Sequence, residues 1–388
     1  NGIFISPLSA FNISDVIGIA LDVDNSEVTF YKNNVVLGNG AYKILKVSPN
    51  YYFYIHARIN NGTSDMTTRY DSSYWAYTAP LGFVELNSNN LENINGLGKP
   101  DLVWIKNRDQ ADSHTLFDSS RGIGKYLESD TTDSEATDVN SLQQFNKGGF
   151  YLGSSIATNT VNESYVAWVW KKGVTPGFDV VEYTGNGTSQ NIDHNLGVIP
   201  EMYIVKNVNG TTTNWGVYHE TIGADYYLVL DGSNAKINSL VAWNNTLPTA
   251  TQFSVGGGHT SVSTDYIAYL FSEIEGYSKI GKYIGNGSTD GPFIHCGFRP
   301  AFLLIKSSIG AAGHWIIYDN VRDDNNDNIP SKLVPSTNGA ESVTLTNYLD
   351  MLSNGFKIRS SSDTINLNAV TFIYMAFAES PFKYSRAR

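Results

Sequence analysis

A pattern that returns every hundred residues limits what this chain can fold into. Pro100 opens the string P-D-L-V-W-I-K-N, Pro200 opens P-E-M-Y-I-V-K-N, and Pro300 opens P-A-F-L-L-I-K-S. A lysine ends each apolar run at the same offset: Lys106, Lys206 and Lys306. Such regular self-similarity indicates one structural unit copied three times. Copies serve reach, contact area or multivalency more often than a single catalytic centre.

The register continues beyond these strings and sets the boundaries of the copies. Each copy carries a phenylalanine after glycine or glutamine, and each closes on an aromatic strand: Gly149-Phe150, Gln252-Phe253 and Gly355-Phe356, then Tyr165–Trp170, Tyr266–Phe271 and Phe372–Phe377. The boundaries follow as 86–174, 175–276 and 277–388, here called repeats 1, 2 and 3, with a separate segment at 1–85. A unit of this length can bury a core of its own.

The spacing of apolar residues predicts an all-β fold. In repeat 1 we expect strands at Leu102–Lys106, Thr115–Phe117, Tyr151–Gly153 and Tyr165–Trp170. Several are continuous apolar runs, which favours strands buried on both faces or at a subunit contact. No convincing amphipathic helix is found in the sequence, and Val139–Phe145 is the best short candidate. A β-sandwich or jelly-roll of seven to nine strands per repeat suits about a hundred residues.

Composition excludes several classes of function. The net charge is −11 and charged residues make up 16% of the chain, so no basic stripe exists to bind nucleic acid. No apolar run has the length of a membrane span. Cys296 is the only cysteine, which rules out an intrachain disulfide and a cysteine-based metal site. The profile is typical of a β-rich extracellular protein with a neutral, polar surface.

Residues 14–38 predict two strands, Val16–Val23 and Glu27–Tyr31, followed by the turn Lys32-Asn33-Asn34. Asn tolerates positive φ, so Asn-rich tight turns indicate hairpins. The string resembles the central strands of a SPRY domain, with Asn34 where glycine is usual. The resemblance implies that 1–85 is the C-terminal part of a SPRY-like β-sandwich. We therefore expect that residues before Asn1 supply its other strands; a small self-sufficient β-domain is the alternative.

Repeat 1 resembles a repeat found in tail-fibre and adhesion proteins of tailed bacteriophages. The resemblance rests on P-D-L-V-W-I-K-N-R-D, F-N-K-G-G-F-Y-L-G-S and N-E-S-Y-V-A-W-V-W-K, on the SPRY-like segment upstream, and on the closing string Ala378–Arg388. It implies a non-enzymatic virion protein, located in the tail fibre and outside the cell, that attaches to the host surface. It further implies a homotrimer that binds other tail proteins through residues before Asn1. The alternatives are a polysaccharide depolymerase and a purely architectural spacer or decoration protein.

Glycan binding is the chemistry that the residues favour, with a bacterial surface glycan or an outer-membrane receptor as partner. Aromatic faces stack on sugar rings, while amides, carboxylates and backbone groups bind hydroxyls. The aromatic residues that could form such a face, or could instead be core residues, are Trp215, Tyr218, Tyr226, Tyr227, Trp243, Trp315 and Tyr318.

An acidic run in repeat 3 is a candidate calcium loop. Asp323, Asn325 and Asp327 alternate as oxygen ligands do at the start of such a loop. Asn328 stands where the turn glycine belongs, and Val334 where the bidentate glutamate belongs. A solvated loop is the alternative. The patterns that would indicate a nucleophile elbow or a P-loop do not occur in the chain. We expect no catalytic residues and no cofactor apart from this calcium.

Overall fold

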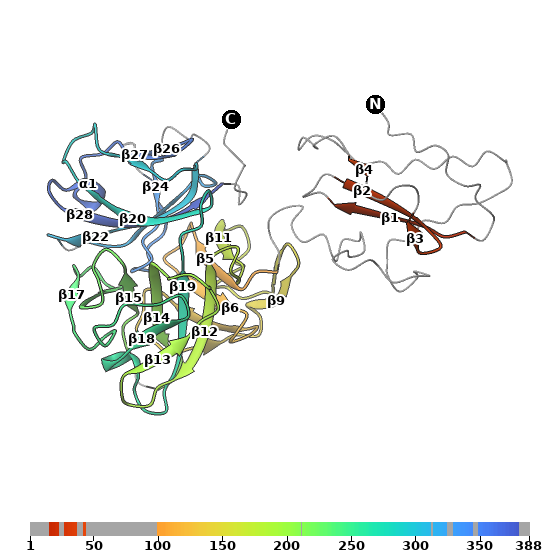
Figure 1. Ribbon diagram of the computed structural model, residues 1–388. Helices are drawn as coiled ribbons and strands as arrows, with labels where there is room; N and C mark the ends of the chain where they lie inside the picture. Colours follow the sequence, from red (N-terminus) through yellow and green to blue (C-terminus); the bar gives the residue numbers. More distant parts are fainter. Residues whose placement is uncertain are drawn as a thin grey trace. The chain divides into compact units, whose positions relative to one another are not determined.

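The computed structural model describes residues 15–22, 27–36, 42–43, 99–210, 212–311, 313–323, 329–343 and 348–379. The chain divides into two compact units at Asn1–Ile94 and Asn95–Arg388. Both are β-structures in their described parts, so the chain is all-β, as the sequence predicts (Figure 1).

The first unit contains one small antiparallel sheet. Its strands are β1 (Ile17–Asp22), β2 (Glu27–Lys32), β3 (Val35–Val36) and β4 (Tyr42–Lys43). β2 pairs with the other three. The predicted hairpin turn is confirmed, because Asn33 and Asn34 have φ values of 50° and 67°. These angles are those of a tight turn whose twist suits the flanking strands. The resemblance to SPRY domains remains a prediction.

In the second unit, three main sheets follow one plan. The strand that carries the Pro-to-Lys string lies between the closing aromatic strand and the strand that follows it in sequence. These central trios are β11-β5-β6 (Tyr165–Trp170, Leu102–Asn107, Thr115–Asp118), β19-β14-β15 (Asp265–Phe271, Met202–Asn207, Gly216–His219) and β28-β22-β23 (Thr371–Ala378, Pro300–Ile309, Ile316–Asp319). All pairings within them are antiparallel.

Further strands extend the trios. β12 (Phe178–Thr184) pairs with β19, and β20 (Ser278–Ile284) pairs with β28. Two short strand pairs extend the other side: β7-β8 (Lys125–Glu128, Ala136–Thr137) and β16-β17 (Tyr226–Val229, Ile237–Asn238). In repeat 3 the corresponding pair β24-β25 (Ser331–Lys332, Ser342–Val343) is a separate two-stranded sheet, joined to β23 by an isolated bridge between Ile317 and Leu333. The helical elements are brief, η2 at Gly257–His259 and α1 at Asp363–Asn366.

Each repeat adds a small outer sheet. These sheets are β9-β10 (Leu142–Asn146, Gly149–Leu152), β13-β18 (Gln190–Asp193, Gln252–Val255) and β21-β27-β26 (Phe293–His295, Gly355–Ile358, Leu349–Leu352). The segment Val139–Phe145, the best candidate for a short helix, is not a helix, because residues from Leu142 onward form strand β9. The turn Gly148, with a φ of 79°, lets β9 return as the hairpin partner β10.

The central strands are buried on both faces, and alternation explains why. In β5, Leu102 and Trp104 pack into a core shared by all three repeats, whereas Val103 and Ile105 pack into a cluster confined to repeat 1. β14 and β22 divide their residues in the same way. Because successive side chains point to opposite faces of a strand, one face supplies the shared core and the other supplies the repeat's own core. The predicted burial on both faces is confirmed, and both faces are covered within one chain.

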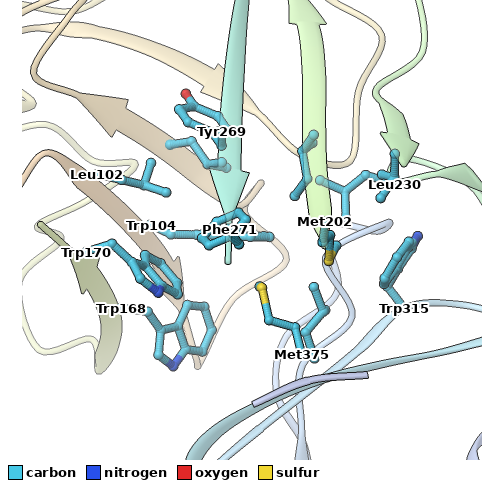
Figure 2. Close-up of a cluster of buried hydrophobic side chains, with 14 of the residues drawn as sticks. Leu102, Trp104, Trp168, Trp170, Met202, Leu230, Tyr269, Phe271, Trp315 and Met375 are labelled. Atoms are coloured by element: carbon cyan, nitrogen blue, oxygen red, sulfur yellow. The ribbon is translucent and has the colours of Figure 1, made fainter. Parts of the chain in front are cut away.

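The shared core has a threefold centre. Trp170, Phe271 and Phe377 hold equivalent positions, each paired with the first apolar residue of its central strand. Their ring centroids are 6.0 Å, 5.7 Å and 6.1 Å apart, so each ring touches both others. Figure 2 shows Trp170 and Phe271 among the surrounding side chains of this cluster, with Met375 contributed by repeat 3. The repeats therefore fold around one another and do not lie as separate units along a line.

Backbone hydrogen bonds run round this centre and close a ring. The amide of Glu135 in repeat 1 donates to Val208 O in repeat 2 (2.8 Å), and that of Lys236 in repeat 2 donates to Ser308 O in repeat 3 (2.9 Å). Glu341 in repeat 3 donates to Arg108 O in repeat 1 (2.8 Å). Three equivalent bonds that return to the starting repeat define a cyclic arrangement, and each contact between two repeats is here called a seam.

Candidate functional site

The outer sheets hold the residues that best fit a contact surface. On their inner faces, Phe150, Phe253 and Phe356 pack into the separate cores of the repeats. The next residue in each strand must point the other way. The cross-strand pairs on the other face are thus Tyr151 with Gln144, Ser254 with Asn191, and Lys357 with Phe293, and of these six residues Ser254 is buried. Tyr151, Ser254 and Lys357 hold equivalent positions in the three repeats, but the partner strand is β9 in repeat 1 and β13 or β21 in repeats 2 and 3. The counterpart of Gln144 in repeat 3 is Asp350 on β26, which also pairs with Lys357.

In repeat 1 the pair combines an aromatic ring with an amide. Tyr151 is 57% exposed, and Gln144 opposite is also exposed. A β-bulge between Tyr151 and Leu152 shifts the register of the hairpin at this point. An open aromatic face beside an amide is the combination that binds the apolar side and the hydroxyls of a sugar.

In repeat 2 the outer sheet presents amides and a carboxylate. Ser254 Oγ donates to Asn191 Oδ1 (2.6 Å), and Gln252 Nε2 donates to Asp193 Oδ1 (2.6 Å). Asn191 and Asp193 are exposed. These bonds fix the rotamers of both side chains and leave further lone pairs for hydroxyl donors.

In repeat 3 the equivalent surface is apolar and cationic. Phe293 is 43% exposed and lies opposite Lys357, whose Nζ donates to Gly291 O (2.7 Å) and pairs with Asp290 (2.7 Å). The hydrogen bond and the positive charge of Lys357 lower the pKa of the Asp290 carboxyl. The three outer sheets thus offer three different contact chemistries on one scaffold.

The aromatic face predicted from the sequence is wrong for five of its seven residues. These five side chains are buried: Trp215, Tyr218, Trp243, Trp315 and Tyr318. The reason lies in the alternation described above, which directs some of these rings into the shared core and the rest into the cores of repeats 2 and 3. A ring enclosed by protein cannot stack on a sugar.

The two buried tryptophans of the shared core also join neighbouring repeats. Trp215 Nε1 donates to Glu128 O in repeat 1 (3.0 Å), and Trp315 Nε1 donates to Val229 O in repeat 2 (2.8 Å). Each indole therefore satisfies its donor across a seam.

Tyr226 and Tyr227 on β16 are half-buried. Lys236 Nζ lies 3.4 Å from the centroid of the Tyr226 ring, a cation–π contact that covers one face. Tyr227 packs against the core of repeat 2. Neither residue offers the open ring face that the prediction required.

The candidate calcium loop is described only at its first residue. Asp323 accepts hydrogen bonds from Ser331 through both oxygens, from Oγ to Oδ1 (2.6 Å) and from N to Oδ2 (3.2 Å). Asn325 and Asp327 lie outside the described residues. Within the described ranges, no group of three or more His, Cys, Asp or Glu side chains is arranged to hold a metal ion.

The acidic loop of repeat 1 forms a seam with repeat 2. Thr132 O accepts a hydrogen bond from Lys206 Nζ (2.8 Å), and Glu128 and Glu135 make the backbone bonds given above. Burial raises the pKa of Glu128 and of Asp130, and Asp130 accepts bonds from Ser113 Oγ and His114 N. The backbone of this loop therefore makes the contacts with repeat 2, while the Asp130 carboxylate stabilises a turn within repeat 1.

The three repeat lysines are buried, and Lys206 and Lys306 lie at contacts between repeats, whereas Lys106 Nζ donates to Asn107 O and Gln110 O of its own repeat. Lys206 Nζ also donates to Thr213 O (2.7 Å) and Asn207 Oδ1 (2.9 Å), and Lys306 Nζ donates to Ser233 O of repeat 2 (3.1 Å). Burial lowers the pKa of Lys206 and of Lys306 to about 8 and also lowers that of Lys106. Carbonyl groups from two repeats thus surround each of Lys206 and Lys306.

The comparison with known families covers all three repeats at once. A family profile described as "Domain of unknown function (DUF7483)" matches residues 84–381. The chain belongs to the DUF7483 family. No curated protein and no solved structure matches the chain. The DUF7483 match begins near the predicted start of repeat 1 and spans the ring, so family and ring coincide in extent.

Sequence reasoning missed the outer pairs of this DUF7483 chain, although the signal was present. The residue that follows each Gly/Gln-Phe pair must face outward once the phenylalanine faces inward. A search for the largest aromatic residues instead selects core positions, because large rings are the ones that fill cores. No helix in the described part of the chain is long and apolar enough to cross a membrane.

Proposed function

We propose that this protein is a non-enzymatic component of a bacteriophage tail fibre that attaches the virion to a glycan on the bacterial surface. The resemblance of repeat 1 to tail-fibre repeats supports the assignment to a virion. The observation that carries the attachment role is the contrast between the two faces of the fold. Equivalent core positions stay apolar in all three repeats, whereas the outward pairs at Tyr151, Asn191 and Phe293 differ.

Three contact surfaces on one scaffold suit weak, repeated ligands. A polysaccharide offers many copies of the same sugar, and binding at one surface makes binding at the next intramolecular. The gain depends on the ring, because it fixes the spacing of the outer sheets. A homotrimer would multiply these surfaces further and remains part of the proposal. The buried central strands no longer argue for it, since this chain covers them itself.

An array of purified bacterial surface polysaccharides, probed with the full chain, tests the proposal. We expect binding to at least one polysaccharide, reduced ~10-fold by Tyr151→Ala, Asn191→Ala or Phe293→Ala, since one aromatic or hydrogen-bonding contact is worth about 1.4 kcal/mol. Val321→Ser is the matched control, because Val321 is exposed but lies outside the outer sheets.

The alternatives give distinct results in the same assay. Release of new reducing ends from the bound polysaccharide would establish a depolymerase and overturn the non-enzymatic assignment. Absence of binding to polysaccharides and to intact host cells would leave the architectural spacer as the function. If all three variants bind as tightly as the unaltered protein, the outer sheets are not the contact surface.

A further inference from the structure

The three seams differ at one equivalent position, the last residue of β6, β15 and β23. Asp118 and Asp319 stand there in repeats 1 and 3, and each is bonded to an arginine three residues on. Arg121 Nε lies 2.6 Å from Asp118 Oδ2, and Arg322 Nε lies 2.6 Å from Asp319 Oδ2. Both ion pairs are buried.

Each carboxylate also accepts a hydrogen bond across its seam. Tyr269 Oη of repeat 2 donates to Asp118 Oδ2 of repeat 1 (2.8 Å). Trp168 Nε1 of repeat 1 donates to Asp319 Oδ2 of repeat 3 (3.1 Å). Tyr269 and Trp168 hold equivalent register positions on β19 and β11. Two of the three seams are thus held by the same side-chain bond, here called the carboxylate lock.

The seam between repeats 2 and 3 has no carboxylate lock. His219 takes the aspartate position, and Ile222 takes the place of the arginine. Met375, which has no hydrogen to donate, stands in register where Tyr269 and Trp168 stand in the other repeats. His219 Nδ1 accepts a bond from Thr221 N (3.1 Å), but its Nε2 is buried without a hydrogen-bond partner.

The surroundings of His219 disfavour a proton on the ring. Burial lowers its pKa to about 3, and the charge of Lys282 on β20 acts in the same direction. The backbone of Tyr374 on β28 lies near enough to favour protonation weakly, though not in hydrogen-bond geometry. Glu220, the next residue, is exposed, and its own carboxyl interacts with Glu273, Lys279 and Lys282.

We propose that the seam between repeats 2 and 3 is an acid-sensitive joint, at which protonation of His219 opens the ring and exposes the shared aromatic core. Repeats 1 and 2 stay together through the lock at Asp118. Repeat 3 stays tethered to repeat 1 through Asp319 and through Glu341, which pairs with Arg108 (2.7 Å). The ring therefore opens at one place and does not fall apart.

The direction follows from proton linkage. An exposed histidine binds a proton near pH 6.5, whereas the enclosed His219 does so only near pH 3. Between these values the open form binds more protons than the closed form. The contribution of His219 to the stability of the seam is therefore full above pH 6.5 and is lost progressively as the pH falls from 6.5 to 3.

Three other buried histidines must be distinguished from His219. His194 Nε2 lies 3.1 Å from Thr249 O within repeat 2, and burial lowers its pKa. His114 accepts a bond from Trp104 Nε1 (3.1 Å) and stacks on Trp168, and burial together with Lys106 and Arg322 lowers its pKa. His259 stacks on Trp243 inside repeat 2, away from the seams, and burial lowers its pKa to about 4. All three add acid sensitivity, but none of them lies at the seam that lacks the carboxylate lock.

Hydrogen exchange read by mass spectrometry on the full chain, at steps from pH 7 to pH 4, tests the proposal. After correction for the intrinsic rate, peptides from β15 and β28 should lose protection first, at a pH where peptides from β6 and β19 are still protected. His219→Asn keeps an acceptor for Thr221 N and should lower the opening pH by roughly half a unit or more. His114→Asn should leave the order of opening unchanged, as should His295→Asn, which alters an exposed histidine.

Simultaneous loss of protection at all three seams would overturn the proposal. So would first opening between β6 and β19, or an unchanged opening pH in His219→Asn. If His219→Asn does not fold, the order of exchange in the unaltered protein decides between the two outcomes.

Discussion

The backbone amide of Glu341 donates to the carbonyl of Arg108 across 233 positions of sequence, and this bond joins the last repeat to the first. Its equivalents at Glu135 and Lys236 join the other two pairs of repeats. The side chain of Glu341 reinforces the closure, because its oxygens pair with Arg108 and with the buried Arg322 (2.5 Å). The ring is thus closed by backbone and side chains at one point.

Glu341→Gln should weaken this closure. The amide cannot replace a carboxylate that serves two guanidinium groups, and hydrogen bonds to charged groups are worth about 1.5–3 kcal/mol each. We expect a loss of about 2 kcal/mol in the free energy of unfolding, measured by urea denaturation. Asp290→Asn is the control. Asp290 is also part of an ion pair, with Lys357, but it is exposed, so its substitution should leave the urea midpoint unchanged. Equal effects of the two changes would contradict the account.

Stability should rise with pH between about 8 and 10. Lys206 and Lys306 have pKa values of about 8 in the folded protein but 10.5 when exposed, so the unfolded chain binds more protons in this window. Above pH 10 the trend should reverse, because burial raises the pKa of Tyr218 and of Tyr277 to about 12. Urea midpoints from pH 7.5 to 11 measure this. In Lys206→Met about half of the rise should disappear; an unchanged slope would show that Lys206 is not the cause.

Cys296 should be unreactive in the folded protein. Burial raises the pKa of its thiol to about 12, and a disulfide reagent attacks only the exposed thiolate. Labelling at pH 8 should therefore be at least ~100-fold slower than in urea, since the thiolate fraction alone falls by more than this factor. Mass spectrometry of the labelled chain gives the rate. Rapid labelling without denaturant would show that the core of repeat 3 is open.

Gly285→Ala should destabilise repeat 3 by about 1–3 kcal/mol or more, the usual cost of overpacking. An added Cβ would lie 2.2 Å from Leu367 O, a backbone atom that cannot move aside easily. Gly149→Ala is the matched control, since nothing lies within 4 Å of its added Cβ. Thermal unfolding compares the two. Similar melting temperatures would show that the Gly-Asn-Gly turn does not need close approach of the backbone.

The sequence predicted the strands better than it predicted their environment. The strands of repeat 1 and the hairpin at Asn33 follow from apolar spacing and from the tolerance of Asn for positive φ, both of which are local properties. The failures concern what covers each residue. From the sequence alone, Trp215 and Trp315 fit a binding surface as well as they fit a core, and only the shared core decides between the two. Val139–Phe145, the best candidate for a short helix, does not form one, because the turn at Gly148 and the pairing of β9 with β10 outweigh its weak helical pattern.

The closure of the ring could not be predicted, because it depends on contacts between residues far apart in sequence. Lys106, Lys206 and Lys306 signalled a repeated role, but only the structure shows carbonyl groups of a neighbouring repeat around Lys206 and Lys306. The outer pairs were predictable in orientation once Phe150, Phe253 and Phe356 were taken as core. Their binding role is the proposal that the polysaccharide array tests.

The central claim is that three repeats share one core, and Trp170→Ala tests it most directly. The residue belongs to repeat 1, but its ring touches Phe271 and Phe377. Removing it should cost about 3–5 kcal/mol. Hydrogen exchange should show that loss of protection in β11, β19 and β28 together, whereas Trp243→Ala, in the separate core of repeat 2, should act mainly on that repeat. Loss of protection confined to repeat 1 in Trp170→Ala would contradict the shared core.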